Sequence, residues 1–352
     1  MKFIHCADIH LGSKMESKLP KDKADERKSE VRTALNRMVS YAATHGIPLI
    51  VLAGDVFDSD CPLKRDKSFF YGVVKGNPKI DFLYLRGNHD NMESYTESDC
   101  ENLKLFSEEW QCYRYGDVDF FGIEMNDTNA LSLYATLSPE KGRTNIVLLH
   151  GQTGDATGKD KINLSRLRGK NIDYLALGHI HSHAVGKLDE RGKWAYSGCL
   201  EGRGFDECGT KGFIVVDTQD MTCTFVENSV RTLEELEVDL SETEDLYTAI
   251  KAAEKSLKGH KNDLVRLVLK GEIDYDGEGL DTEIERQLSS ECYFLSVKNK
   301  TVRRFDLEAL KGDKSLRGEF IRTVLGSGDY SEEQKRQIIS VGLNALSGRE
   351  VE

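Results

Sequence analysis

Several features that would define a class of protein are missing from this sequence. No apolar run approaches the roughly 20 residues that cross a bilayer, so we expect no membrane-spanning segment. The first residues, MKFIHCADIHLG, lack the basic head and apolar stretch of a secretory signal, which predicts a cytoplasmic protein. The eight cysteines contain no Cys-x-x-Cys pair, and five prolines are too few for a proline-rich arm.

The chain has 352 residues, enough for two or three domains with a substantial core. Its 48 basic and 60 acidic residues give a formal net charge of −12. Because proteins bind nucleic acid largely through basic side chains, an acidic net charge disfavours DNA binding by this chain alone. Any contact with DNA must therefore be local, assisted by metal or shared with a partner.

The first 230 residues alternate short apolar runs with polar helical stretches, a pattern typical of layered sheet and helix. Helical character is found at 26–45 and 66–76. After Asp119 the turn signals come closer together, which predicts a second, more antiparallel sheet. We expect a mixed α/β fold with two packed sheets flanked by helices. The predicted buried strands are Phe3–Ala7, Pro48–Ala53, Phe82–Leu85, Ile146–Leu149 and Tyr174–Leu177.

The composition shifts near Arg231, where a long stretch without glycine begins. We predict a small αβ domain over 231–304, built from helices and strands at 243–258, 264–269, 279–288 and 293–297. The remaining residues, 305–352, hold two short amphipathic helices. Their predicted apolar stripes are Leu316, Phe320 and Val324, then Ile339, Leu343 and Leu346. Ser331 and Gln334 fit a capping box for the second helix.

Polar clusters follow five of the apolar runs, and each cluster has a glycine nearby. In Asp8-Ile9-His10 the two-residue spacing lets both polar side chains face one ion, and His179 with His181 repeats it. Singly these clusters are weak, because a histidine at a strand end, such as His150, is more often a hydrogen-bonded structural residue. Together they place five of nine histidines in ordered motifs. The five clusters are DIH at 8–10, GDVFD at 54–58, RGNHD at 86–90, His150 alone, and GHIH at 178–181.

In this order the five clusters resemble the calcineurin-like metallophosphoesterases, a family with an αββα four-layer sandwich and two metal ions. Carried over residue by residue, the resemblance implies that Asp8, His10 and His181 bind one ion. It implies that Asn88, His150 and His179 bind the other and that Asp55 bridges the two.

Such a pair of ions suits phosphoester chemistry, since it can activate water and neutralise charge during in-line displacement. Mixed imidazole, carboxylate and amide ligands favour Mn²⁺, with Fe²⁺ and Zn²⁺ as alternatives. The resemblance implies that His89 is the general acid and that Asp58 orients it, although Asp58 also suits a helix N-cap. Arg86 suits either a substrate phosphate or a structural ion pair.

Within this family the sequence resembles the SbcD-type DNA repair nucleases. The cluster GDVFD, the segment 196–213 with Phe205-Asp206-Glu207, and a small αβ domain followed by two helices all resemble them. The resemblance implies a Mn²⁺-dependent DNA exonuclease or endonuclease, with domain 1–230 as nuclease, 231–304 as capping domain and 305–352 as binding tail. The implied partners are DNA and an SbcC-like coiled-coil ATPase.

Two other functions stay open. One is a stand-alone phosphodiesterase that acts on nucleotides or other small phosphoesters. The other is a non-catalytic adaptor with the same fold, which the complete ligand set disfavours. The sequence leaves open whether the chain forms a homodimer.

Overall fold

The computed structural model describes residues 1–15, 19–59, 62–90, 100–304 and 314–346. The chain divides into two compact units, Met1–Leu233 and Glu234–Glu352. Among the described residues, no helix combines the length and the apolar character that crossing a bilayer requires.

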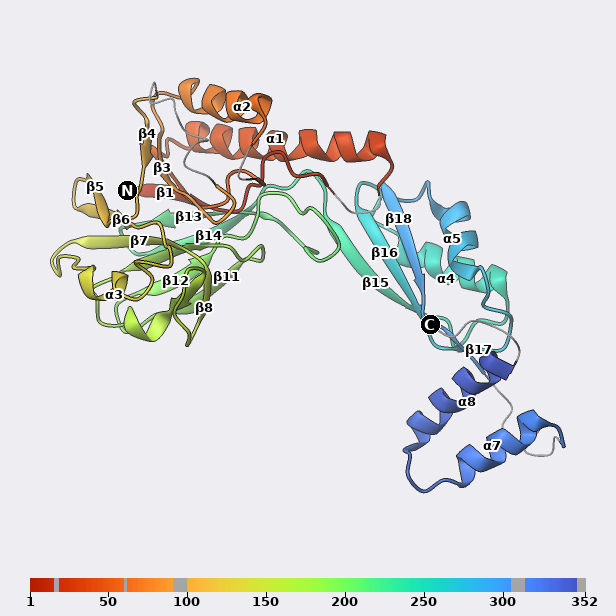
Figure 1. The fold of residues 1–352 in the computed structure, drawn as a ribbon. Coiled ribbons are helices and arrows are strands. Elements are labelled where there is room, and N and C mark those ends of the chain that lie inside the picture. The colour runs from red at the N-terminus through yellow and green to blue at the C-terminus, as the bar shows by residue number, and fades with distance from the viewer. Residues whose placement is uncertain (16–18, 60–61, 91–99, 305–313, 347–352) are drawn as a thin grey trace. The chain divides into compact units, whose positions relative to one another are not determined.

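The first unit contains two six-stranded sheets (Figure 1). The first sheet has the order β14-β13-β1-β2-β3-β4, and β1 to β4 run parallel. Its strands are β1 (Lys2–Cys6), β2 (Leu49–Ala53), β3 (Asp81–Leu85), β4 (Leu103–Leu105), β13 (Gly212–Asp217) and β14 (Thr222–Glu227).

The second sheet has the order β11-β12-β10-β7-β6-β5. Its four central strands are parallel and only its two edge strands are antiparallel. Its strands are β5 (Gln111–Tyr115), β6 (Val118–Gly122), β7 (Thr144–His150), β10 (Tyr174–Gly178), β11 (Ala184–Lys187) and β12 (Lys193–Tyr196).

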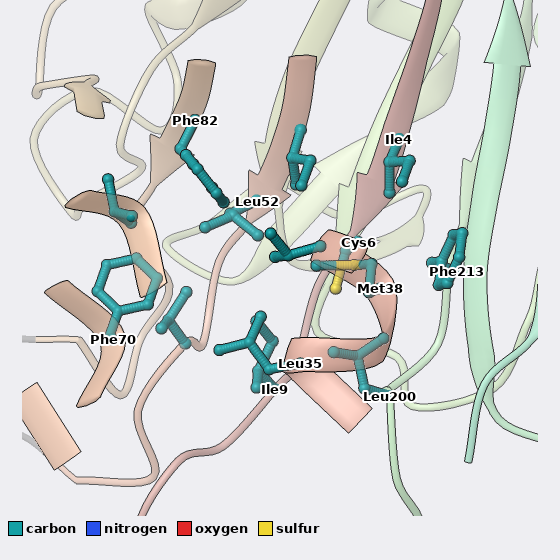
Figure 2. Close-up of a cluster of buried hydrophobic side chains, with 14 of the residues drawn as sticks. Ile4, Cys6, Ile9, Leu35, Met38, Leu52, Phe70, Phe82, Leu200 and Phe213 are labelled. Atoms are coloured by element: carbon teal, nitrogen blue, oxygen red, sulfur yellow. The ribbon is translucent and has the colours of Figure 1, made fainter. Parts of the chain in front are cut away.

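Successive side chains on the buried strands of the first sheet point to opposite faces and therefore belong to two different hydrophobic cores. In β2, Leu49 and Val51 face the second sheet, where they join residues such as Ile146 and Leu148 of β7. Ile50 and Leu52 face the opposite way, toward helices α1 (Lys21–Thr44) and α2 (Lys64–Lys75). Figure 2 shows this helix-facing core, in which strand, helix and loop side chains interlock.

The outer face of the second sheet is covered mainly by short elements. Leu149 and Leu177 pack there with side chains from α3 (Leu133–Thr136), β9 (Lys161–Asn163) and the neighbouring turns. Strand β8 (Gln152–Gly154) pairs with β9. The expected mixed α/β sandwich of two packed sheets is therefore confirmed.

Two details of the expected fold were wrong. The second sheet is not more antiparallel than the first, because long connections after β6, β7 and β10 return the chain to the same end. Helix α1 begins at Lys21, five residues before the predicted start. Its first turns are polar and one of their residues, Arg27, is buried by ion pairs, which hydrophobic periodicity does not signal.

The second unit contains a three-stranded sheet of β15 (Leu233–Asp239), β16 (Leu264–Lys270) and β18 (Phe294–Asn299). Helices α4 (Leu246–Ser256) and α5 (Leu280–Leu288) share its apolar core. Asp245 and Thr248 form a capping box that fixes the start of α4. A short pair, β17 (Glu272–Ile273) and β19 (Val302–Arg303), extends this unit.

Helices α7 (Leu316–Gly326) and α8 (Glu332–Leu346) pack on each other through Ile321, Val324, Ile339 and Leu343. The Ser331–Gln334 capping box is confirmed by reciprocal hydrogen bonds of 2.9 and 3.2 Å. The predicted stripes are only partly buried, because Leu316 is 70% exposed and Leu346 is 39% exposed. The hairpin thus keeps some apolar surface free of contact within the described chain.

Candidate metal centre

The five predicted polar clusters meet at one edge of the sandwich. Asp8 and His10 follow β1, Asp55 follows β2, and Asn88 follows β3, while β1, β2 and β3 are parallel neighbours. His150 ends β7, and His179 with His181 follows its parallel neighbour β10. Carboxyl ends of parallel strands share an edge, so side chains far apart in the sequence become neighbours.

At this edge the backbone of several residues has a positive φ, a conformation that residues other than glycine rarely adopt. Asp8, His10, Asp55 and His179 have φ of 53°, 51°, 51° and 96°. Backbone hydrogen bonds between the loop after β1 and the loop after β2 stabilise this conformation. Asp8 N–H donates to Gly54 O at 3.0 Å, and His10 N–H donates to Asp55 O at 3.0 Å. Such strain concentrates at functional sites, where the surrounding structure compensates for it.

Two glycines of the motifs leave room for site residues. A Cβ on Gly54 would lie 2.1 Å from His150 Nδ1, and Gly54 has a φ of +101°. A Cβ on Gly87 would lie 2.1 Å from Asp55 Oδ1. Both glycines therefore serve the close approach of loops that carry polar site residues.

The first cluster consists of Asp8, His10 and His181, whose candidate ligand atoms all lie within 4.8 Å of one another. His10 Nε2 and His181 Nε2 face each other at 3.2 Å. His10 Nδ1 lies 3.0 Å from Asp58 Oδ1, and His181 Nδ1 lies 2.6 Å from Glu207 Oε1. Arg203 Nη2 also lies 3.1 Å from His181 Nδ1, but a guanidinium can only donate, so this contact competes with Glu207 for that nitrogen. His10 Nδ1 is buried and makes no hydrogen bond of good geometry, although Asp58 Oδ1 lies 3.0 Å away. A carboxylate beside each Nδ1, closest at His181, favours the tautomer in which the two Nε2 lone pairs face each other.

The second cluster consists of Asp8, Asp55 and His150. His150 Nδ1 donates to Ala53 O at 2.9 Å, because a carbonyl oxygen can only accept. Only in the neutral ring, the form that binds metal, does His150 Nε2 carry a lone pair, and it lies 3.3 Å from Asp55 Oδ2 and 3.0 Å from Asn88 Oδ1. His179 Nδ1 also lies 3.3 Å from Asn88 Oδ1. The structure thus brings together all seven residues that the sequence predicted as ligands.

Both clusters fit divalent metal ions. In each, lone pairs of imidazole nitrogens and carboxylate oxygens converge without enough protons to satisfy them, an arrangement that a cation stabilises. Asp8 belongs to both clusters, and Asp55 Oδ2 lies 3.3 Å from His150 Nε2 and 4.0 Å from His10 Nε2. A bound pair of ions would supply Lewis acidity and an activated water here.

The close approach of carboxylates and imidazoles shifts the pKa values of several site residues. Burial raises the pKa of Asp8. Burial also acts on Asp55, but the neighbouring His150 and His10 hold the pKa of Asp55 well below its usual range. Burial opposes charge on His150, yet Asp55 and Asp8 raise the pKa of His150 to about 9. The site therefore attracts positive charge strongly enough to overcome desolvation.

The predicted acid His89 is exposed beside the first cluster. Its ring centroid lies 5.5 Å from that of His10, and its backbone N–H donates to Asp55 Oδ1 at 3.0 Å. Asp58 contacts His10 Nδ1, and it does not cap a helix because α2 begins at Lys64. Arg86 makes a bidentate ion pair with Glu124, as in the structural alternative for that residue.

Asp90 organises the loops beneath Asp55. Its carboxylate accepts the backbone N–H groups of Val56, Phe57 and Gly87 at 3.2, 3.0 and 3.1 Å. Desolvation and the charge of Asp55 raise the pKa of Asp90 to about 6, against these donors. The final residue of RGNHD thus joins two loops of the site.

Sequence reasoning assigned no role to Arg203 and Glu207, which lie behind His10 and His181. Glu207 contacts His181, and Arg203 Nη1 donates to Asp58 Oδ1 at 2.7 Å. Although burial opposes it, His181 and Arg203 hold the pKa of Glu207 well below its usual range. The available signals were the resemblance of the segment 196–213, which includes Glu207, and the glycines of the loop 202–209 after β12.

Comparison with known proteins agrees with this geometry. The model of the calcineurin-like phosphoesterase family matches residues 1–183, and the chain belongs to this family. The DNA double-strand break repair protein Mre11 of Sulfolobus acidocaldarius is 21% identical over 100% of this chain and 97% of its own length. The uncharacterized metallophosphoesterase YhaO of Bacillus subtilis is 27% identical over 77% of this chain and 72% of its own length.

Among solved structures, TT1561 of Thermus thermophilus superposes with a TM-score of 0.44 and 13% identity, over 64% of this chain and 98% of that one. A dimetal phosphatase from Danio rerio gives a TM-score of 0.38 and 11% identity, over 61% of this chain and 91% of that one.

Proposed function

We propose that this chain is a Mn²⁺-dependent DNA nuclease that hydrolyses phosphodiester bonds with two metal ions and works in DNA repair with an SbcC-like coiled-coil ATPase. The observation that carries the phosphodiesterase part is the pair of acceptor clusters sharing Asp8, with Asp55 between His10 and His150. Imidazole-rich clusters of this kind favour Mn²⁺, Fe²⁺ or Zn²⁺ over Mg²⁺.

In this proposal each side chain has a defined role. Asp8, His10 and His181 hold one ion; Asn88, His150 and His179 hold the other; Asp55 bridges them. His89, exposed beside the first cluster, protonates the leaving oxygen. Asp58 orients His89 in this proposal, as the family resemblance implies, and its Oδ1 also lies 3.0 Å from His10 Nδ1. Arg86 reaches a phosphate only if its pair with Glu124 opens, so we give it no role in the step itself.

DNA as the substrate is supported by the relative from Sulfolobus acidocaldarius, a DNA double-strand break repair protein. The similarity covers both units of this chain rather than the phosphoesterase unit alone. On this basis residues 1–230 are the nuclease, 231–304 a capping domain and 305–352 the tail that binds the ATPase.

The exposed apolar surface of the α7–α8 hairpin supports a partner. Leu316 and Val341 are 70% and 50% exposed although their helices already pack on each other. A partner that covers them and supplies basic side chains also compensates for a chain with net charge −12, which repels DNA.

The test compares three substrates with purified chain and Mn²⁺: end-labelled duplex DNA, circular single-stranded DNA and bis(4-nitrophenyl) phosphate. We expect the wild type to cleave all three substrates, with the ATPase and ATP stimulating cleavage of duplex DNA. The Asp55→Asn variant should cleave none of them. Cleavage of the small diester alone, with or without the ATPase, would indicate a stand-alone phosphodiesterase. No cleavage of any substrate would indicate an adaptor.

A second arm tests the tail. Deleting residues 305–352 should leave hydrolysis of the small diester within about twofold and abolish both ATPase binding and ATP-stimulated DNA cleavage. A truncated chain that binds the ATPase unchanged would contradict the proposed role of the hairpin.

A further inference from the structure

We propose that Arg203 and Glu207 are positioning residues that hold both histidines of the Asp8–His10–His181 cluster in the tautomer that binds metal. The inference rests on the metallophosphoesterase site and not on DNA as its substrate. Neither residue belongs to the five motifs, and both come from the loop that follows β12.

Glu207 holds the outer nitrogen of His181. Its side chain is 5% exposed, and Oε1 lies 2.6 Å from His181 Nδ1. Its other oxygen, Oε2, accepts the backbone N–H of Arg203 at 2.8 Å. Arg203 Nη2 also lies near His181 Nδ1, at 3.1 Å, but Nη2 donates to Glu207 Oε1 at the shorter distance of 2.8 Å. The carboxylate at 2.6 Å therefore decides the tautomer: it keeps the proton on Nδ1 and leaves Nε2 as the metal ligand.

Asp58 does for His10 what Glu207 does for His181. Asp58 Oδ1 lies 3.0 Å from His10 Nδ1, close enough to pair with it although the two atoms are not aligned as a hydrogen bond, and His10 Nε2 faces His181 Nε2 at 3.2 Å. The cluster therefore contains two carboxylate–histidine pairs, one hydrogen-bonded and one in ion-pair contact, whose Nε2 atoms converge.

A single guanidinium joins these two pairs. Arg203 Nη1 donates to Asp58 Oδ1 at 2.7 Å, and Nη2 donates to Glu207 Oε1 at 2.8 Å. Arg203 Nε also donates to Glu207 Oε1, at 3.1 Å. The planar fork of arginine reaches both carboxylates at once, whereas the single ammonium of lysine has no such fixed geometry. Arg203 thus sets the distance between Asp58 and Glu207, and through them the orientation of His10 and His181.

The loop that carries Arg203 is itself anchored. Arg27, 1% exposed on α1, donates to Glu201 Oε1 at 2.8 Å and to Gly202 O at 2.6 Å. Glu201 Oε2 also accepts the backbone N–H of Val230 at 2.6 Å. At the other end of the loop, Gly209 N–H donates to Leu233 O at 2.9 Å. The position of Arg203 is therefore fixed before metal binds, as preorganised ligand support requires.

The test is a calorimetric titration of metal-free protein with Mn²⁺ alone, without substrate. Glu207→Gln should weaken one of the two Mn²⁺ sites roughly 10–100-fold and leave the other unchanged. Arg203→Lys keeps the charge but loses the fork, and it should weaken the same site by at least about threefold. The matched control is Arg191→Gln, which removes another arginine–carboxylate pair, with Asp173, at the opposite end of β10. It should bind both ions as the wild type does.

A kinetic readout separates positioning from general structural support. With bis(4-nitrophenyl) phosphate, the kcat of Glu207→Gln at ordinary Mn²⁺ should fall and should recover as Mn²⁺ is raised about 100-fold. Wild-type affinity at both sites in Glu207→Gln, or a loss that excess Mn²⁺ does not restore, overturns the proposal. If Glu207→Gln fails to fold, Arg203→Lys decides by the same two measurements. Failure to cut DNA affects neither measurement, so the test is independent of the proposed nuclease function.

Discussion

Both carboxylate oxygens of Asp8 accept the backbone N–H of His179, at 2.9 and 3.0 Å. This contact joins the first and last motifs of the site, which lie 171 residues apart in the sequence. Asp8 follows a strand of the first sheet and His179 a strand of the second. The two sheets therefore meet at the candidate metal centre, and the geometry of this site depends on their packing.

The role of His89 can be separated from metal binding. Since its side chain is assigned as an acid and not a ligand, His89→Gln should keep both ions and lose roughly 10²–10⁴ in rate. The loss should be smallest for diesters with a good leaving group, which need little protonation. Elemental analysis and a leaving-group series provide the two measurements. A His89→Gln protein that loses metal contradicts this assignment.

Gly54 should be intolerant of any side chain. In Gly54→Ala the new Cβ would lie 2.1 Å from His150 Nδ1 on a backbone with φ of +101°. We expect His150 to be displaced, Mn²⁺ affinity to fall at least about tenfold and diester hydrolysis to fall with it. The control is Gly72→Ala in α2, where a Cβ meets nothing within 4 Å and alanine favours the helix. Equal Mn²⁺ affinity in the two variants would show that His150 does not need this space.

His5 should make the protein sensitive to acid. It links the two sheets, through Tyr174 OH at 2.8 Å and Leu177 O at 3.2 Å, and burial lowers its pKa to about 3. Above pH 6.5 the ring is neutral in both states and contributes no pH dependence. As pH falls from 6.5 toward 3, the unfolded chain binds a proton that the folded chain does not, so stability is lost by about 1.4 kcal/mol per pH unit.

The measurement is the free energy of unfolding at about pH 7 and about pH 5 for the wild type and His5→Gln. Other groups titrate equally in both proteins, so the difference isolates His5. The stability advantage of the wild type should shrink by about 2 kcal/mol between these two conditions. A difference that does not change with pH would mean that His5 binds its proton equally well in the folded and unfolded chain, against the lowered pKa.

The α7–α8 hairpin offers a paired test of core and surface. Ile321 is fully buried between the helices and Leu316 of the same helix is exposed. Ile321→Ala should destabilise the hairpin by about 2–4 kcal/mol, seen as faster amide exchange in both helices. Leu316→Ala should leave exchange unchanged and weaken binding of the ATPase partner. Equal exchange in the two variants would contradict the packing of this hairpin.

The sequence predicted the buried parallel strands and the residues at their ends well, because such strands are short apolar runs closed by glycine and polar residues. The parallel orientation of the central strands in the second sheet was not predictable. It depends on the paths of long connections, and these paths produce no periodic pattern in the sequence. Arg203, Glu207 and Arg27 were missed for a related reason. Their roles come from ion pairs between distant segments, whereas Asp8 and His10 are recognisable within three residues.

The most direct test of the account is the number of Mn²⁺ ions bound per chain, measured by elemental analysis after saturation and removal of free metal. The two clusters that share Asp8, with Asp55 between them, predict two ions in the wild type and clear loss of metal, with loss of diester hydrolysis, in Asp55→Asn. No more than one ion in the wild type, or full activity in Asp55→Asn, would contradict a two-metal phosphoesterase site.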